Sequence, residues 1–309
     1  MLENTQRLII LDFSVYIHTA HAIWQKNPDI PPTYTALAMI LGQLYRIGIE
    51  PDDVVMFVLD SRPCWRVEVD PNYKANRTPL PEQIRTDFET FKNKLNQNTN
   101  WIFVGPIPKV ESDDIAAVIC KHYQNIPEII LITIDSDWEQ MWSLHPGVKI
   151  LSMKTKEWKI RPENYNVYSE LAKKVHKETS DNLVTSVVTA VDYDTRLMLV
   201  DLTRLPEWVE KSVIEYLSNP ELYQKNVYPE IMPSKSLQER FDNLYNDRSK
   251  VIDYDFFVAK KLKKEARKKE IKIEVKAKIK RAKEREKKQA LKLKISTKIK
   301  GDTNVSQTN

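Results

Sequence analysis

The chain has 309 residues, 41% of them hydrophobic, and a formal net charge of +5, which allows one substantial core with a smaller lobe. Its two cysteines, Cys64 and Cys120, exclude a disulfide framework and a cysteine-based zinc site, and they fit a reducing compartment. No signal peptide precedes the first apolar segment and no apolar run reaches ten residues, which excludes a membrane span. We therefore expect a cytoplasmic protein.

The net charge is distributed unevenly. Residues 259–300 hold 20 Lys and Arg against 5 Glu, a local net charge of +15, whereas residues 1–258 carry a net charge of −9. Polycationic segments of this kind often bind nucleic acid through its phosphates. The alternative is a solvated charged helix without a specific role.

Strand and helix patterns alternate through the first 160 residues. Apolar runs predict strands over 7–13, 53–60, 101–104, 128–134 and 148–153, with a hairpin partner near 158. Helical spacing predicts helices over 15–24, 34–47, 82–95, 111–123 and 138–144. Between them, residues 61–81 mix aromatic and basic residues with prolines and have no steady period. The alternation predicts an α/β fold with a central, mostly parallel sheet flanked by helices.

The strand pattern stops beyond residue 162. Helical candidates follow over 165–177, 183–190 and 207–217, and the tail from 256 to 294 lacks Pro and Gly, which predicts a long helix. We expect an α/β domain over 1–162, a smaller helical region over 163–255, and a basic helical tail over 256–309 whose end is disordered.

Carboxylates stand at the ends of three predicted strands and at the start of one predicted helix. In parallel α/β sheets, ligand sites form at the carboxyl ends of the strands. Several acids in one cleft resist ionising together unless a cation joins them, and carboxylate oxygens suit Mg²⁺ or Mn²⁺ better than zinc. The acids concerned are Asp12, Asp60, Glu111, Asp113, Asp114, Asp135 and Asp137.

Local structural roles are the alternative for each of these acids. Ser136 or Asp137 suits a helix N-cap, and acids in a first helical turn complement the helix dipole. Glu111 and Asp114 are three residues apart and share one helix face, whereas Asp113 points elsewhere. The convergence of all four groups on one sheet edge favours the metal site.

The segments ILDFS, FVLDSRPCWR, NYKANR, VESDDIAAVI and ITIDSDWEQM occur in this order. Together they resemble the flap endonuclease/5′-nuclease superfamily, and most of all its T-even bacteriophage branch. The likeness covers roughly residues 6–220, and five motifs in order with similar spacing form a specific signature. The resemblance implies a PIN-like 5′-nuclease catalytic domain over 1–162 and a shortened DNA-binding region over 163–255.

The resemblance also implies two metal sites, occupied by two Mg²⁺ ions about 4 Å apart, for which Mn²⁺ can substitute. The first site would comprise Asp12, Asp60, Glu111 and Asp113, with Asp114 beside it. Asp135 and Asp137 would extend toward the second. Later family acids match Glu178 and Asp181 in the segment E-T-S-D-N, with Glu in place of the first Asp.

Nucleic-acid contacts are implied for the segment between the second and third strands. Lys74 and Arg77 match basic residues of the helical arch that grips the scissile phosphate, where they would neutralise developing charge. Arg66 is a further candidate. Trp65 or Tyr73 would stack on a displaced base, an interaction worth roughly 1–3 kcal/mol; packing against the sheet is the alternative.

One feature departs from the family pattern. Many members carry a Gly-rich helix–hairpin–helix that holds the duplex, but this chain has no glycine from 148 to 300, and such turns rely on glycine for positive φ. We expect the basic tail to supply the missing duplex affinity. His18 is interpreted as structural, because no nucleophile pairs with it.

The expected function is a Mg²⁺-dependent 5′→3′ exonuclease and flap endonuclease with RNase H activity. It would remove RNA primers and 5′ flaps during DNA replication, as a phage-encoded monomer in the host cytoplasm. Its substrates would be DNA and RNA:DNA hybrids with 5′ ends or flaps, and single-strand binding protein and a sliding clamp would be partners. The alternatives are a PIN-type ribonuclease, which would lack the NYKANR arch, and a nucleic-acid-binding scaffold with a reduced active site.

Overall fold

The computed structural model describes residues 2, 5–176, 190–223, 235–244 and 247–303. The chain forms two compact units, residues 1–254 and residues 255–309. Glu178, Asp181 and the helix expected over 183–190 lie outside the described residues. Within the described ranges, no helix combines the length and apolar character needed to cross a lipid bilayer.

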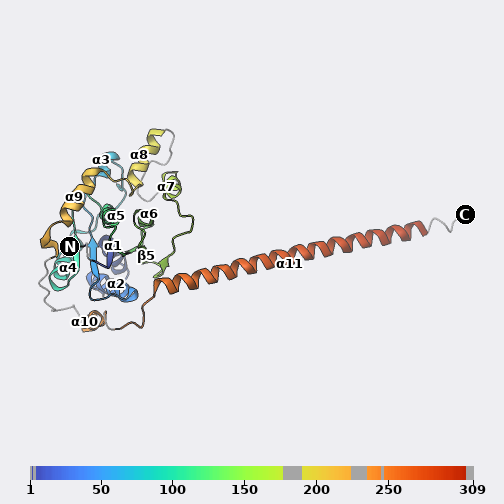
Figure 1. Cartoon of the computed structure of the whole chain (residues 1–309), viewed down its shortest axis with the longest axis horizontal. Coiled ribbons are helices and arrows are strands. Elements are labelled where there is room, and N and C mark those ends of the chain that lie inside the picture. The colour runs from blue at the N-terminus through green and yellow to red at the C-terminus, as the bar shows by residue number, and fades with distance from the viewer. Residues whose placement is uncertain (1, 3–4, 177–189, 224–234, 245–246, 304–309) are drawn as a thin grey trace. The chain divides into compact units, whose positions relative to one another are not determined.

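A six-stranded sheet with the order β3-β2-β1-β4-β5-β6 lies at the centre of the first unit. Figure 1 shows the labelled helices of this unit around it. The first five strands pair in parallel, and β6 pairs antiparallel with β5. The predicted, mostly parallel α/β sheet is therefore confirmed. The strands are β1 (Arg7–Asp12), β2 (Val54–Val58), β3 (Ile102–Val104), β4 (Glu128–Thr133), β5 (Val148–Ser152) and β6 (Trp158–Lys159).

The register of the three central strands aligns their acidic ends. Asp12 of β1 lies opposite Val58 of β2, two residues before Asp60. Leu11 lies opposite Ile132 of β4, three residues before Asp135. Because all three strands run in the same direction, their acids emerge at one edge of the sheet.

Helices cover both faces of the sheet, which explains why its strands are apolar without alternation. On one face, Leu8 and Ile10 belong to the same buried cluster as Ile115 and Val213 of two covering helices. On the other face, Phe57 makes an edge contact with Phe13. The helices of the sheet region are α1 (Phe13–Trp24), α2 (Pro32–Ile47), α4 (Glu82–Asn98), α5 (Ser112–His122), η2 (Asp137–Gln140), α6 (Met141–Leu144) and α9 (Glu207–Leu217).

Shorter helices surround this core. Residues Arg66–Val69 form α3, within the segment for which the sequence shows no steady period. α7 (Val167–His176) contacts α8 (Ala190–Val200). The remaining short elements are η3 (Pro220–Tyr223) and α10 (Lys235–Asp242). The sequence does not predict α10, because it is short and polar and buries a single residue, Leu237.

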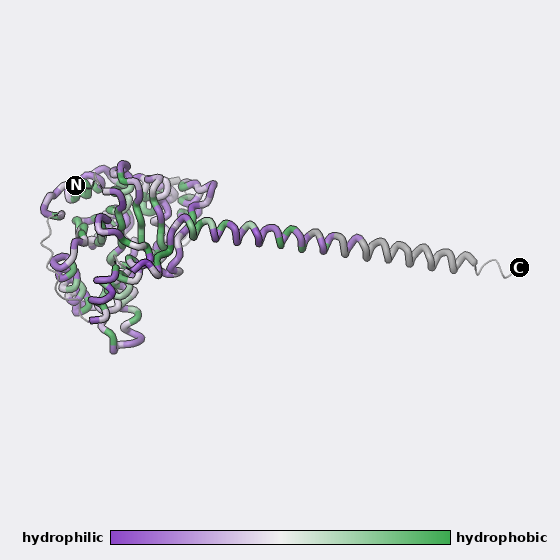
Figure 2. The backbone as a smooth tube through the Cα atoms, turned by 60° about the horizontal axis from the view of Figure 1, so that its bottom comes forward, coloured by the Kyte–Doolittle hydropathy of each residue, from purple (hydrophilic) through white to green (hydrophobic). Residues whose placement is uncertain are grey.

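The second unit, residues 255–309, contains nearly all of α11 (Tyr254–Thr303), the long helix predicted for the basic tail. Over residues 271–280, apolar residues alternate with Lys and Glu, a period that suits a strand rather than a helix. In a helix this alternation spreads apolar and charged side chains around the axis, as the mixed colours along α11 show (Figure 2). Ile271, Ile273, Val275 and Ile279 are exposed. The described part of α11 therefore lacks the continuous apolar stripe that a partner helix requires.

Candidate active site

A cleft of about 430 Å³ lies where the acidic strand ends meet. Four of the acids expected at this edge line it: Asp12 after β1, Asp60 after β2, Asp113 in the first turn of α5, and Asp135 after β4. The other lining residues are Ser14, Val15, His18, Thr19, Arg62, Lys74, Arg77, Thr78, Ser112 and Ile134. The predicted convergence of three strand ends and one helix start is thus present.

Asp12 and Asp60 are held by backbone and hydroxyl donors. Oδ1 of Asp12 accepts the N–H groups of Ser14 at 3.0 Å and Val15 at 3.4 Å, which makes Asp12 the N-cap of α1. Asp60 accepts the Ser14 hydroxyl at 2.6 Å and the Ser112 N–H at 2.9 Å. Ser14 therefore contacts both carboxylates and fixes one relative to the other. Asp12 serves as a cap and lines the cleft at the same time.

Asp135 and Asp113 are fixed by contacts around the end of β4. The N–H of Asp135 donates to Oγ1 of Thr133 at 3.0 Å, and Oδ1 of Asp135 accepts the N–H of Asp137 at 2.8 Å. Oδ1 of Asp113 accepts the indole N–H of Trp138 at 2.5 Å. The fully buried Trp138 is a residue that sequence analysis missed, since its partner lies 25 residues away.

Three of the four cleft carboxylates have raised pKa values. Burial, and then the charges of Asp60 and Asp135, raise the pKa of Asp12 well above its ordinary value. Burial and the charge of Asp135 likewise raise the pKa of Asp113, and burial and Asp137 raise the pKa of Asp135. Burial alone would also raise the pKa of Asp60, but hydrogen bonds from Ser14 and Ser112 outweigh it and lower that pKa.

This donor set fits a hard divalent cation, because every donor is an oxygen and a positive charge would relieve the repulsion. As they stand, no three His, Cys, Asp or Glu side chains in the described part of the chain form a group that could hold a metal ion.

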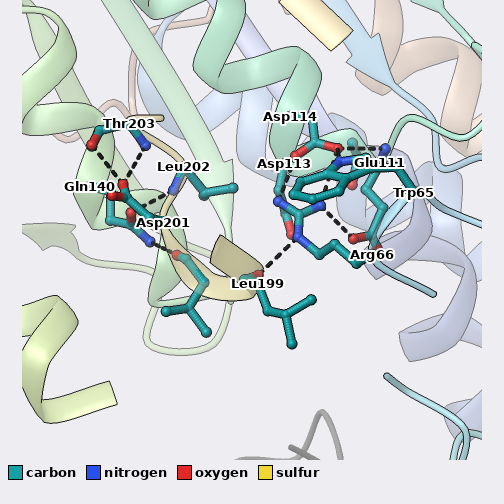
Figure 3. Close-up of polar contacts among 12 residues, drawn as sticks. Trp65, Arg66, Glu111, Asp113, Asp114, Gln140, Leu199, Asp201, Leu202 and Thr203 are labelled. Atoms are coloured by element: carbon teal, nitrogen blue, oxygen red, sulfur yellow. Dashed lines mark hydrogen bonds and ion pairs between the residues drawn. The ribbon is translucent and has the colours of Figure 1, made fainter. Parts of the chain in front are cut away.

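Glu111 and Asp114 are not part of the cleft lining and contact a buried arginine, Arg66 (Figure 3). The Arg66 guanidinium donates to Glu111 at 2.8 Å and to Asp114 at 2.7 Å, and the Nε of Arg66 donates to the carbonyl of Leu199 at 2.9 Å. Glu111 and Asp114 thus share one face, as their spacing predicts. Asp114 is fully buried and also accepts the indole N–H of Trp65. The expectation that Asp114 lies beside a metal is corrected: its charge is neutralised by Arg66.

The nucleic-acid contacts expected of Arg66, Trp65 and Tyr73 are wrong. Their side chains are 1%, 3% and 7% exposed. Two of them donate to Asp114, and the hydroxyl of Tyr73 donates to Glu111 at 3.1 Å. These residues face inward because two buried carboxylates need donors. Of the two aromatic residues, Trp65 packs in the cluster that contains the strand residues, whereas Tyr73 packs with residues of α7 and α8.

Lys74 and Arg77 do line the cleft, as the arch resemblance implies. Nζ of Lys74 donates to Oε1 of Glu111 at 2.7 Å. Burial alone would lower the pKa of Lys74, but the Glu111 carboxylate outweighs it and raises the pKa well above the ordinary value. In this arrangement both oxygens of Glu111 accept hydrogen bonds from protein donors rather than lining the cleft.

Asp137 contacts the cleft acid Asp135 through its backbone N–H, but its carboxylate has another partner. It pairs with Lys174 of α7 and is not part of the cleft lining. Lys174 is a second residue that sequence analysis missed, because nothing local relates it to an acid 37 residues earlier. The acids expected to complete a second metal site, Glu178 and Asp181, lie outside the described residues.

The end of α8 is anchored to both acid-bearing regions (Figure 3). Arg66 holds the carbonyl of Leu199. The side-chain amide of Gln140, three residues after Asp137, donates to the carbonyl of Val200 and accepts the N–H of Leu202, both at 2.9 Å. The helical region beyond residue 162 is thereby tied to the elements that carry the carboxylates.

His18 and Arg62 also line the cleft, although sequence analysis interpreted His18 as structural and passed over Arg62. Both are exposed. A signal was available for each. His18 and Thr19 follow Val15 by three and four residues and share its helix face, while Arg62 stands two residues after Asp60.

Comparisons with known proteins agree with this architecture. Residues 7–178, more than half of the chain, match the family model of the 5′-3′ exonuclease, N-terminal resolvase-like domain. The flap endonuclease Xni of Photorhabdus laumondii is 28% identical over 155 residues, which cover 49% of this chain and 57% of that protein. The Xni of Vibrio atlanticus is 26% identical over 162 residues, covering 50% and 60%.

A solved structure shares the fold. The T5 D15 protein, co-crystallised with metal ions, superposes with a TM-score of 0.51 at 17% identity, covering 71% of this chain and 100% of that one. The matches to the bacterial proteins leave about two fifths of those relatives uncovered. The match over residues 7–178 confirms the resemblance seen in the sequence, and the chain belongs to the 5′-3′ exonuclease family.

Proposed function

We propose that this chain is a divalent-metal-dependent 5′ nuclease that cleaves phosphodiester bonds at 5′ ends and flaps. The observation that carries the proposal is the convergence of Asp12, Asp60, Asp113 and Asp135 on one cleft that Lys74 and Arg77 also line. The carboxylate oxygens suit a metal cation, and the cationic side chains suit a phosphate group. Such a cleft can bring the two together for phosphodiester cleavage. Membership of the 5′-3′ exonuclease family supports the same chemistry.

Mg²⁺ is the proposed cofactor, with Mn²⁺ as a substitute, because the donors are carboxylates and hydroxyls. Asp12, Asp60, Asp113 and Asp135 would hold it. When bound, the cation would supply charge stabilisation and activate water for attack on phosphorus. Lys74, now bonded to Glu111, would turn to the scissile phosphate and neutralise developing charge.

The protein groups around the acids would keep them in place during this chemistry. Ser14 contacts Asp12 and Asp60, and Trp138 contacts Asp113. These donors restrict the carboxylates, so less ordering is needed when the cation binds. A second cation near Asp135 and Asp137 would have to displace Lys174 from its ion pair.

The proposed substrates are DNA and RNA:DNA hybrids with 5′ ends or flaps, and hydrolysis of the hybrid would constitute RNase H activity. Removing RNA primers and 5′ flaps during replication, in bacterial or host cytoplasm, is the corresponding role. We place catalysis in residues 1–162 and duplex contacts in 163–255. The chain would act as a monomer, with single-strand binding protein and a sliding clamp as partners.

The tail would provide sequence-independent affinity. Residues 259–300 carry a net charge of +15, and the described part of α11 has cations around its axis rather than along one stripe. A rod of this kind suits the phosphates of nucleic acid more than it suits a partner helix.

The decisive experiment is cleavage of a 5′-labelled flap and of a 5′-labelled RNA:DNA hybrid in Mg²⁺, alongside the Asp135→Ala variant. Cleavage by the wild type that is lost in the variant is expected, and the size of the labelled product separates exonucleolytic from endonucleolytic cutting. Tight, salt-sensitive binding without cleavage would favour the scaffold alternative. Cleavage confined to single-stranded RNA would favour a PIN-type ribonuclease.

A further inference from the structure

The cleft has a second set of residues whose chemistry is opposite to that of its acids. His18 and Thr19 come from α1, and Arg62, Arg77 and Thr78 come from the segment after β2. Imidazole, guanidinium and hydroxyl groups all donate hydrogen bonds to anions. The cleft therefore combines a cation-binding part and an anion-binding part.

His18 is displaced along α1 from the acids. It lies six residues after Asp12, the N-cap of α1, which is about 9 Å of helix rise at 1.5 Å per residue. Partial burial and the nearby charges of Arg62 and Arg77 lower the pKa of His18, while Asp60 opposes them. Both arginines line the same cleft as His18.

Arg62 differs from the neighbouring cations in its contacts. Arg66 is buried between two carboxylates, and Lys74 is bonded to Glu111. Arg62 is exposed at the cleft, and none of the ion pairs found among the described residues involves it. Its planar guanidinium can therefore offer paired donors to phosphate oxygens.

We propose that His18 and Arg62, with Thr19 and Thr78 beside them, form a subsite for a phosphate group of the substrate strand that neighbours the scissile phosphate. This inference rests on the proposed nuclease function and specifies how the strand is held. The scissile phosphate must lie at the carboxylates and their cation, and one phosphate group cannot also reach a set displaced along α1. The neighbouring phosphate is either a terminal 5′-monoester or a backbone diester, and the two share the same donors.

The test is a binding cycle on the full chain in EDTA, so that affinity is measured without turnover. Fluorescence anisotropy would compare a flap oligonucleotide carrying a 5′-phosphate with the same oligonucleotide ending in a 5′-hydroxyl. A second series would replace single backbone phosphates near the junction by neutral methylphosphonates. The variants are Arg62→Gln and His18→Gln. Matched controls are Arg85→Gln in α4, an exposed arginine paired with Glu82, and His122→Gln in α5.

We expect removal of one phosphate charge to weaken wild-type binding roughly three- to tenfold, the effect of losing a charge-assisted contact at a partly exposed site. In Arg62→Gln and His18→Gln, the ratio of the dissociation constants without and with that phosphate charge should fall toward one. Both control variants should keep the wild-type ratio, because the cycle isolates the pairwise interaction. If replacing the 5′-phosphate by a 5′-hydroxyl weakens binding, the subsite holds a terminal monoester. If a methylphosphonate weakens binding, the subsite holds a backbone diester.

The proposal is overturned if no phosphate replacement weakens wild-type binding, or if both variants retain the full penalty. The proposed nuclease function is tested separately, since it fails only if the protein does not cleave its substrates in Mg²⁺. Because the cycle is measured in EDTA, it tests the subsite whether or not the chain cuts.

Discussion

The indole N–H of Trp138 donates a 2.5 Å hydrogen bond to Oδ1 of Asp113, joining the segment after β4 to the first turn of α5. Trp138 is fully buried, whereas Asp113 lines the cleft. The bond therefore fixes the Asp113 carboxylate relative to the core. Burial and the charge of Asp135 raise the pKa of this carboxylate and so disfavour its ionised form. A cation in the cleft would find Asp113 already oriented.

Replacing Trp138 by Phe should reduce catalysis more than stability. The ring still fills much of the core, but Asp113 loses its donor, and loss of such a supporting contact typically costs about 10–100-fold in metal affinity or activity. The measurement is the initial cleavage rate as a function of Mg²⁺ concentration. The Mg²⁺ concentration that gives half of the maximal rate should be higher for Trp138→Phe than for the wild type.

Trp142→Phe is the matched control. Trp142 is also buried, and its indole N–H has no hydrogen-bond partner among the described residues. The control loses a similar volume without releasing a carboxylate, so its Mg²⁺ dependence should match that of the wild type. Equal shifts in the two variants would show that Trp138 acts through packing alone.

The sequence predicts the sheet and the four cleft acids because both depend on local patterns. Continuous apolar runs mark strands buried on both faces, and an acid at the end of each run is placed at one edge by parallel pairing. No tertiary detail is needed to bring Asp12, Asp60 and Asp135 together.

Side-chain direction in residues 61–81 could not be predicted in this way. That segment has no period, so nothing in it shows that Arg66 and Tyr73 turn inward while Arg62 and Arg77 line the cleft. The direction is decided by Glu111 and Asp114, two carboxylates about 40 residues away that need donors once they are buried. Lys174 and Trp138 also have partners far along the chain, 37 and 25 residues away.

Arg66→Met should destabilise the protein strongly. Breaking a buried ion pair from one side leaves its partners unpaired, at a cost of about 3–5 kcal/mol, and Arg66 holds both Glu111 and Asp114. Urea unfolding would measure the change. Arg204→Met is the control, because the exposed Arg204 lies 3.9 Å from Asp201, and a solvent-exposed pair contributes little to stability.

The loss of stability in Arg66→Met should depend on pH. Although burial alone would raise the pKa of Glu111, Lys74 and Arg66 outweigh it and hold that pKa below its ordinary value. The stabilisation is therefore present above the unfolded pKa and is lost as the pH falls through the lowered folded pKa. The stability difference between the wild type and Arg66→Met should narrow in acid; a constant difference from pH 7 to pH 3 would contradict this account.

Asp113→Asn should abolish cleavage and yet stabilise the metal-free protein at neutral pH. Burial and Asp135 raise the pKa of Asp113, so the folded state binds its proton more tightly than the unfolded state does. The stabilisation is present below the unfolded pKa and is lost as the pH rises through the raised folded pKa. Removing the charge should therefore raise the free energy of unfolding of the metal-free protein at neutral pH.

Thermal unfolding in EDTA between pH 4 and pH 8 would check this. The wild type should lose stability relative to Asp113→Asn as the pH rises, and Mg²⁺ should stabilise the wild type more at pH 8 than at pH 5. Asp52→Asn, at an exposed loop position, should match the wild type throughout. A less stable Asp113→Asn at pH 8 in EDTA would show that the carboxylate is not repelled by its neighbours.

Deleting residues 259–309 should weaken nucleic-acid binding and flatten its salt dependence. The segment 259–300 contributes a net charge of +15, and each phosphate neutralised on a duplex contributes a slope of about −0.9 to the dependence of log K on log salt. The deletion falls outside the first compact unit, residues 1–254, so cleavage at saturating substrate should persist. A full-length variant with the same lysines and arginines changed to glutamine separates charge from chain length. Both variants should lose about tenfold or more in affinity at 100 mM salt, with a shallower slope. An unchanged slope would assign duplex binding to residues 1–258 instead.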